Sequence, residues 1–232
     1  MIDYQATLIE GRLISRYKRF FADIDTGDGV ITAHCANTGR MTGLIEEGSR
    51  VWFRKQPSGR KLGFAWELVE VSSDMACINT MRANELLSST DLSFLIPGVS
   101  FFRREPKVGS HRLDLELSRE GHPVYVEIKS VTLCEDEGVG LFPDAPSERA
   151  TQHVSLLSEM AASGLETHLV FVAMHTGIQS VAPNRLLDPT FSKACIKAND
   201  AGVAFHAVGA EITPNHIPVS YTHLTLPTTP YV

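Results

Sequence analysis

The chain has 232 residues, a formal net charge of −6 at neutral pH, 43% hydrophobic residues and 21% charged residues. This composition is ordinary for a globular protein and excludes collagen-like, coiled-coil and largely disordered chains. The acidic balance also argues against a general polyanion binder of the histone type, because affinity for phosphate depends on concentrated Lys and Arg.

No stretch reaches the roughly 20 consecutive apolar residues that cross a bilayer, and the first ten residues lack the basic and apolar regions of a secretion signal. The cysteines lie far apart and do not have zinc-ligand spacing: Cys35, Cys77, Cys134 and Cys195. These features predict a soluble, cytoplasmic protein with reduced thiols and no membrane partner.

The first third of the chain has the pattern of short strands separated by Gly-rich turns. The expected strands lie at 6–23, 30–36, 50–54 and 64–71. Alternation and turns at this spacing predict a small closed barrel of the OB type over residues 1–74. Such barrels commonly hold single-stranded nucleic acid on basic and aromatic surface, an analogy at the level of the fold.

The rest of the chain alternates helical and strand patterns. A helix at 78–89 precedes strands at 99–105, 112–117 and 124–131, and a loop at 135–146 leads to a helix at 147–162 that Ser147 caps. A continuous apolar run at 167–175 predicts a central strand buried on both faces. A helix at 187–199 and a strand at 203–208 follow.

This order predicts a second, α/β domain over residues 75–219, so the fold class is α+β. The Thr- and Pro-rich end at 220–232 fits neither domain. We expect it to be a disordered tail or a remnant of cloning.

Three side chains of the second domain form a candidate metal site. Asp114 lies in one expected strand, and Glu127 and Lys129 lie at alternate positions of the next, which puts them on one face. If a turn at 121–123 joins the two strands as a hairpin, the two carboxylates converge. Mg²⁺, or Mn²⁺ in its place, suits such a pair because it binds one or two carboxylates together with water and phosphate oxygens.

Lys129 would then orient the attacking water and stabilise charge on the phosphate. Each fragment alone is weak, because Glu-x-Lys on a solvated strand arises by chance. The combination of Asp, then Glu-x-Lys one strand later, then a capped helix resembles the PD-(D/E)xK nuclease superfamily over residues 78–208. Catalytic roles are therefore predicted for Asp114, Glu127 and Lys129.

Accessory residues are less well specified by the pattern. Arg149 and Gln152 on the following helix are candidates for the shell around the site, although a polar helix face explains them equally well. Glu105 is preferred to Glu85 as an additional metal ligand. The histidines His34, His153 and His175 lack metal-ligand spacing and are interpreted as structural or rim residues.

Basic and polar residues of the barrel are candidates for contact with nucleic acid. Arg16, Lys18 and Arg19 form a basic island next to aromatic residues, which is either a backbone-contacting surface or a solvated strand face. Asn37 and Thr38 precede a glycine, a combination of ordinary turn chemistry that also suits a phosphate contact from Thr38.

Several separated blocks resemble the bacterial and archaeal sugar fermentation stimulation family over residues 6–212. The blocks are Arg16-Tyr17-Lys18-Arg19-Phe20, Asn37-Thr38-Gly39, Trp66-Glu67, Glu127-Ile128-Lys129-Ser130-Val131-Thr132-Leu133, and Phe142-Pro143-Asp144-Ala145 with Glu148-Arg149. The resemblance implies an OB-like barrel, a nuclease-like domain, and sequence-nonspecific DNA binding linked to the regulation of sugar metabolism, especially maltose. The tail departs from the family pattern.

Three functions stay open at this point. The first is a magnesium-dependent nuclease acting on nucleic acid, with DNA the expected partner. The second is a DNA-binding regulator that keeps the nuclease-like fold without turnover. The third is a protein that binds a phosphorylated metabolite or nucleotide between barrel and domain. The intact carboxylate pair favours the first, because a pure DNA binder gains nothing from two carboxylates that repel phosphate.

Overall fold

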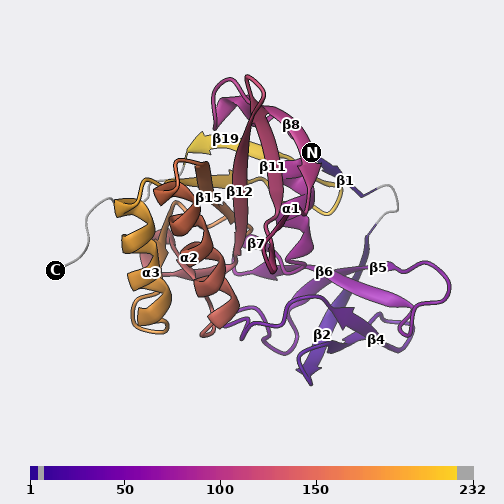
Figure 1. Cartoon of the computed structure of the whole chain (residues 1–232). Helices are drawn as coiled ribbons and strands as arrows, with labels where there is room; N and C mark the ends of the chain where they lie inside the picture. The colour runs from indigo at the N-terminus through magenta and orange to yellow at the C-terminus, as the bar shows by residue number, and fades with distance from the viewer. Residues whose placement is uncertain (5–7, 224–232) are drawn as a thin grey trace.

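The fold of the chain is known from a computed structural model that describes residues 1–4 and 8–223. A small barrel, in indigo and violet, lies below a larger sheet flanked by helices (Figure 1). No helix within the described part of the chain is long and apolar enough to cross a membrane.

The N-terminal strands form the predicted closed barrel. Strands β2 (Ile9–Tyr17), β3 (Phe21–Asp25), β4 (Val30–Cys35), β5 (Arg50–Lys55) and β6 (Phe64–Val71) pair in the order β4-β3-β2-β5-β6, and a parallel pairing of β4 with β6 closes the ring. Alternate side chains such as Leu13, Ile24, Phe53 and Trp66 fill its interior. The OB-like class is therefore confirmed.

The single strand expected at 6–23 is wrong, because the chain reverses within it. Lys18 and Arg19 both adopt left-handed backbone angles, with φ of 48° and 64°, and join β2 to β3. Two consecutive positive φ angles fit the right-handed twist of paired strands. Neither residue is Gly, Asn or Asp, the types usual at such a turn, so the sequence alone did not reveal it.

The second domain is built on a six-stranded mixed sheet in the order β19-β17-β15-β12-β11-β8. Its strands are β8 (Ser100–Arg104), β11 (Leu115–Arg119), β12 (His122–Val131), β15 (Glu166–Ala173), β17 (Ala204–Ala210) and β19 (Val219–His223). The predicted central strand is confirmed, because β15 lies between β12 and β17 and runs parallel to both.

Helices cover the two faces of this sheet. The helix α1 (Met81–Ser88) packs on one face, and α2 (Glu148–Ala162) and α3 (Pro189–Asp200) lie side by side on the other (Figure 1). The hydroxyl of Ser147 accepts a hydrogen bond from the Ala150 N–H, which confirms the predicted cap of α2. Asp188 caps α3 in the same way.

Several short elements form where the sequence predicted loops. The expected loop at 135–146 contains part of β13 (Leu133–Glu135), the 3₁₀ turn η2 (Asp136–Gly138) and β14 (Val139–Phe142). These strands form a three-stranded sheet with β16 (Ser180–Pro183). The parallel partner of β14 lies about 40 residues further along the chain, so local sequence carries no signal for it.

The chain ends also differ from expectation. Strand β1 (Ile2–Asp3) pairs with β18 (His216–Ile217) of the second domain, so the chain begins there before it enters the barrel. The predicted tail starts inside a strand, because β19 pairs with β17. The remainder of that tail, 224–232, lies outside the described residues. The boundary near Asp74 stays a prediction; β7 (Asp74–Cys77) pairs with β6, and its Ala76 forms a bridge with His175.

A buried carboxylate joins the two domains. Glu67 of β6 has no exposed surface. It accepts hydrogen bonds from Arg54 of β5 at 2.6 Å and from Arg82 of α1 at 2.9 and 3.0 Å. Asn79 also donates to both of its oxygens at 3.1 Å. The charge of Glu67 is therefore compensated from both sides of the seam.

We expect Glu67→Ala to lower the free energy of unfolding by about 3–5 kcal/mol, because it leaves two cations without their buried partner. Glu10 is the matched control, since its carboxylate pairs with Arg50 on the surface. Glu10→Ala should cost far less, because water already solvates both charges. Urea denaturation of the two variants measures the difference, and equal losses would contradict the role of Glu67.

Candidate metal centre and interdomain cavity

Asp114 lies in the irregular segment just before β11, not inside a strand as predicted. Its Oδ1 accepts a hydrogen bond of 2.6 Å from the Asn84 side chain of α1, and its Oδ2 accepts one of 2.7 Å from the Ile128 N–H of β12. Burial, followed by repulsion from Glu127, raises the pKa of the Asp114 carboxyl to about 6. Two donors thus fix a carboxylate whose charge the surroundings disfavour.

Glu127 is held on β12 by two nitrogen groups. The Lys129 ammonium donates to Oε1 at 2.5 Å, and Nδ1 of His153 on α2 lies 2.6 Å from the same oxygen. Burial acts to raise the pKa of the Glu127 carboxyl, but Lys129 and His153 outweigh burial and hold the pKa below its ordinary value. Glu127 is therefore ionised at neutral pH.

The second oxygen of Glu127 makes the site incomplete. Oε2 is buried and has no hydrogen-bond partner among the described residues. An ionised oxygen without a partner is costly in a protein interior, and a cation shared with Asp114 would satisfy it. Within the described residues no group of three or more His, Cys, Asp or Glu side chains could hold a metal ion. The remaining ligands would have to be water and substrate oxygens, which Mg²⁺ accepts.

His153 occupies the position that the sequence assigned to Arg149 or Gln152. The structure places Arg149 and Gln152 on the exposed face of α2, whereas His153 is buried against Glu127. His153 is therefore not a rim residue, and it supports Glu127 from α2. His153 has the helical spacing of the buried residues Ala150, Val154 and Leu157, which predicts that it is buried too. We missed this signal because histidine is polar and does not stand out as a core residue.

The Glu105 carboxylate is not placed in the buried pair. Its side chain is largely exposed and lies 3.4 Å from Arg112. The alternative, Glu85, pairs with Arg82 at the seam. The neighbour that the sequence missed is Asn84, one residue from Glu85 on α1, which bonds to Asp114. A helix turns about 100° per residue, so adjacent positions cannot both face the site.

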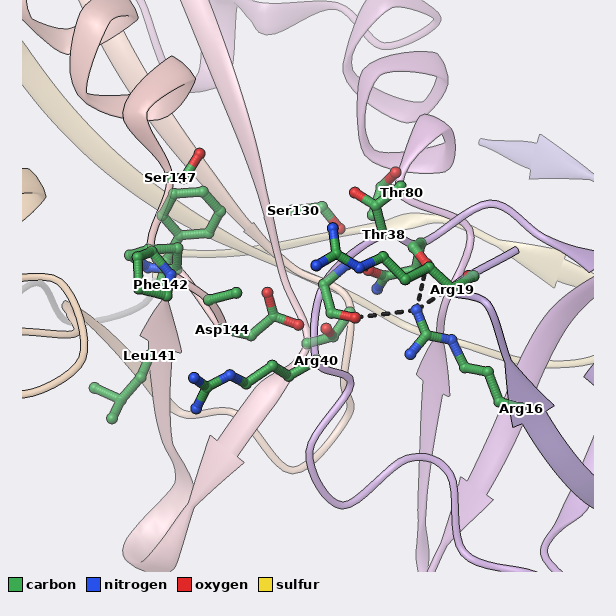
Figure 2. A pocket seen from close by; sticks show the side chains of 16 residues that line it. Arg16, Arg19, Thr38, Arg40, Thr80, Ser130, Leu141, Phe142, Asp144 and Ser147 are labelled. Carbon is green, nitrogen blue, oxygen red and sulfur yellow. Dashed lines mark hydrogen bonds between the residues drawn. The ribbon is translucent and has the colours of Figure 1, made fainter. Parts of the chain in front are cut away.

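A cavity of about 560 Å³ opens between barrel and second domain beside this site. Figure 2 shows Arg16, Arg19 and Arg40 on its barrel side and Leu141, Phe142 and Ser147 across from them. Four of the five residues predicted to contact nucleic acid line it, the exception being Lys18 in the turn before Arg19. Ser130, three residues after Glu127 on β12, lines the cavity as well, and about 10 Å of strand separates the two positions, whose side chains point to opposite faces of the sheet.

Arg16 shapes the cavity wall. Its Nη2 donates to the backbone oxygens of Arg19, Asn37 and Gly39 at 2.9–3.1 Å, as the dashed lines of Figure 2 partly show. The Asn37 side chain is buried and accepts from the Gly39 N–H at 2.8 Å. Arg16 and Asn37 therefore stabilise the loop at 37–40, on which Thr38 and Arg40 are exposed, and Arg19 is exposed on the neighbouring β2–β3 turn.

Gly39 brings this loop against the second domain. A Cβ at Gly39 would lie 2.2 Å from the Asp144 carboxylate, which also accepts from the Met41 N–H at 3.1 Å. Gly39 is therefore needed because a side chain would clash, and not because of its backbone angle, since its φ is not positive. The contact places the barrel loop directly over the segment that leads into α2.

The fold and the site define a two-domain protein in which an OB-like barrel precedes an α/β domain of the restriction-endonuclease class. Two family profiles match the chain, "SfsA N-terminal OB domain" over residues 14–78 and "Sugar fermentation stimulation protein RE domain" over residues 78–216. The chain belongs to the sugar fermentation stimulation protein family.

Relatives agree with this assignment, and a solved structure shares the fold. A sugar fermentation stimulation protein homolog of Ectopseudomonas mendocina (strain ymp) is 40% identical over 223 residues, which cover 92% of this chain and 95% of the relative. One of Marinomonas sp. (strain MWYL1) is 39% identical over 88% of this chain and 82% of its own. The structure of Pyrococcus furiosus SfsA in complex with Ca²⁺ superposes with a TM-score of 0.87 at 23% identity and covers 97% of both chains.

The raised pKa of Asp114 predicts a pH-dependent response to metal. An aspartate that titrates at about 6 when folded and about 3.9 when unfolded binds its proton more tightly in the fold, so its contribution to stability falls as pH rises between these values. A cation offsets this loss only where Asp114 is ionised. Millimolar Mg²⁺ or Mn²⁺ should therefore raise the melting temperature above about pH 6 and progressively less below it.

Thermal denaturation across pH with and without metal measures this response. Asp114→Asn, which keeps the shape without the charge, should lose most of the metal-induced shift at neutral pH. Ser118→Ala on β11, the strand that follows Asp114, is the control and should respond like the unaltered protein. A metal response of full size in Asp114→Asn would remove Asp114 from the site.

Proposed function

We propose that this protein is a Mg²⁺-dependent nuclease that binds DNA without sequence preference, with Mn²⁺ able to replace Mg²⁺. The observation that carries the proposal is the unpartnered, buried oxygen of Glu127 beside Asp114 and Lys129. Two carboxylates repel a phosphodiester unless a cation lies between them. The Ca²⁺ complex of the Pyrococcus furiosus protein supports a hard cation in this fold.

Residues of the chain orient the two carboxylates and the attacking water. Asn84 and the Ile128 N–H hold Asp114, and His153 holds Glu127, so both carboxylates are oriented before substrate arrives. Such supporting hydrogen bonds fix the geometry of ligands. A bound Mg²⁺ would polarise the phosphate and lower the pKa of a bound water. Lys129 is the group that can orient that water and stabilise charge on the phosphate.

The barrel contributes residues that can bind the nucleic-acid strand. Arg19 and Arg40 are exposed at the cavity, and Thr38 is exposed beside them with its hydroxyl group. Cations and hydroxyls of this kind contact phosphates without reading sequence. Ser130 at the cavity and Glu127 of the carboxylate pair belong to the same strand, β12, which connects the two sites.

Two other functions have an observation in their favour. The side chains of Glu127 and Lys129 are only 3% and 10% exposed and bind each other, which suits a DNA-binding regulator without turnover, in line with the family's name and its link to sugar metabolism. The cavity volume lies in the range of small-molecule sites, roughly 300–1,000 Å³, which suits a phosphorylated metabolite or nucleotide.

Lys129→Ala separates a nuclease from a regulator. In a nuclease this variant should retain metal and DNA but lose most of its cleavage rate, because the ammonium acts mainly in the transition state. In a regulator the variant should show only a modest, salt-sensitive loss of affinity for DNA. Single-turnover cleavage and a binding titration on the same variant distinguish the two, with Lys197→Ala on exposed α3 as control. Absence of cleavage by the unaltered protein with every metal and nucleic acid would leave the regulator.

The paired change Arg19→Ala and Arg40→Ala tests the cavity. Because each lost duplex phosphate contact removes about 0.9 from the slope of log affinity against log salt, two contacts should flatten it by about 1.8. The control Lys193→Ala with Lys197→Ala removes the same charge from α3 and should leave the slope nearly unchanged. Equal slopes in both pairs would exclude the cavity as the DNA-binding site. Saturation of the protein by a mononucleotide would favour the alternative function, binding of a phosphorylated metabolite or nucleotide.

A further inference from the structure

A second basic surface lies beside the carboxylates, on a part of the chain that the sequence did not assign to nucleic-acid binding. Residues 100–112, here called the β8–β10 arm, comprise β8 and the hairpin of β9 (Lys107–Val108) and β10 (His111–Arg112). The arm holds four Lys or Arg residues and one carboxylate in a chain of net charge −6. Its charge is therefore opposite to that of the protein.

The arm also exposes two adjacent aromatic rings. All five residues of β8 are exposed, and Phe101 and Phe102 are 50% and 59% exposed. A single exposed apolar residue is common on protein surfaces, but two large ones side by side indicate a binding surface. The guanidinium of Arg103 lies 5.4 Å from the Phe102 ring centre and bonds to Glu116 at 2.7 Å. This contact holds the ring in a defined orientation.

The features of β8 disfavour a second protein strand as the occupant. β8 is an edge strand at the top of Figure 1, away from the barrel. Its register skips Phe102, because Leu117 faces Phe101 and Glu116 faces Arg103. Bulges and arginines are the devices by which sheets block pairing at an open edge. Flat apolar rings with free cations suit bases and phosphates instead.

Backbone contacts place the arm directly at the metal site. Arg104 faces Leu115 in the sheet, and the Glu105 N–H donates to the Asp114 backbone oxygen at 2.9 Å. The hairpin reaches α2, where the His111 ring packs edge-on against His153 at 5.9 Å. His153 itself bonds to Glu127. The carboxylate pair thus lies between the arm and the segment of β12 that lines the barrel cavity.

We propose that the β8–β10 arm binds single-stranded nucleic acid, with unstacked bases on Phe101 and Phe102 and phosphates on Arg104 and Lys107. This inference rests on the proposed nuclease function and deepens it, because it names the substrate as a strand that is single-stranded at the carboxylates. Bases in a duplex are stacked on one another and cannot lie on both rings. Duplex binding by the same protein depends on the barrel cavity and on charge alone.

The test measures binding without cleavage, in metal-free buffer, with a fluorescein-labelled thymidine oligonucleotide and a duplex of equal length. The paired change Phe101→Ala and Phe102→Ala should weaken binding of the single strand about tenfold or more, since one base stacked on an aromatic ring contributes about that much. Binding of the duplex should change less than about twofold. The conservative pair Phe101→Tyr and Phe102→Tyr keeps the rings and should bind the single strand normally.

Two further variants complete the design. Arg104→Gln with Lys107→Gln should flatten the salt dependence of single-strand binding by about 1.4, because each phosphate contact on a single strand contributes about 0.7. Leu186→Ala removes an apolar side chain that is 94% exposed before α3 and should have no effect. Metal-induced thermal shifts should be the same in all these variants, since none of them removes a carboxylate of the pair.

The outcomes separate the two proposals. If the unaltered protein binds neither nucleic acid, the proposed function fails and the arm with it. If it binds the single strand and the alanine pair binds equally well, or if the tyrosine pair binds as weakly as the alanine pair, the arm proposal alone is overturned. A concentration-dependent dimer in sedimentation that the alanine pair abolishes would assign the rings to a second copy of the chain and overturn it too.

Discussion

The carboxylate of Glu67 is fully enclosed at the seam between the two domains, and the geometry of the candidate site depends on its compensation. Arg54 reaches it from the barrel and Arg82 from α1. Removing either cation leaves a buried charge, which is far more costly than breaking a surface pair. The barrel therefore cannot rotate freely against α1. Asn84, which orients Asp114, lies on the same helix two residues after Arg82.

The carboxylate pair shows a balance between stability and chemistry. Asp114 is held in a place that disfavours its charge, and Glu127 keeps one buried oxygen without a partner. Sites that are poor in stabilising contacts and rich in shifted pKa values are typical of functional centres. Lys129 and His153 neutralise only one oxygen of Glu127. A divalent cation would compensate the charge on the other oxygen of Glu127.

The surfaces around the pair come from three distant parts of the chain. The barrel loop at Asn37–Arg40 contacts Asp144 through Gly39, and it brings the exposed Arg40 to the segment before α2, with Arg19 of the β2–β3 turn beside it on the same cavity. The β8–β10 arm brings cations and rings from the opposite side. An acidic protein can bind a polyanion if its few free cations gather in this way, because phosphate contacts depend on local charge.

The sequence by itself determined the closed barrel, the central strand β15, the cap of α2 and the proximity of Asp114, Glu127 and Lys129, because each depends on local periodicity, turn chemistry or neighbouring strands. Only the tertiary structure decided what surrounds the triplet. It buried His153 against Glu127, bonded Asn84 to Asp114 and bonded Arg16 to the backbone of the barrel loop. It also paired β14 with β16 and β1 with β18. These contacts join residues far apart in the chain, and the physical reason for the difference is that burial and hydrogen bonding between distant segments leave no period in either segment alone.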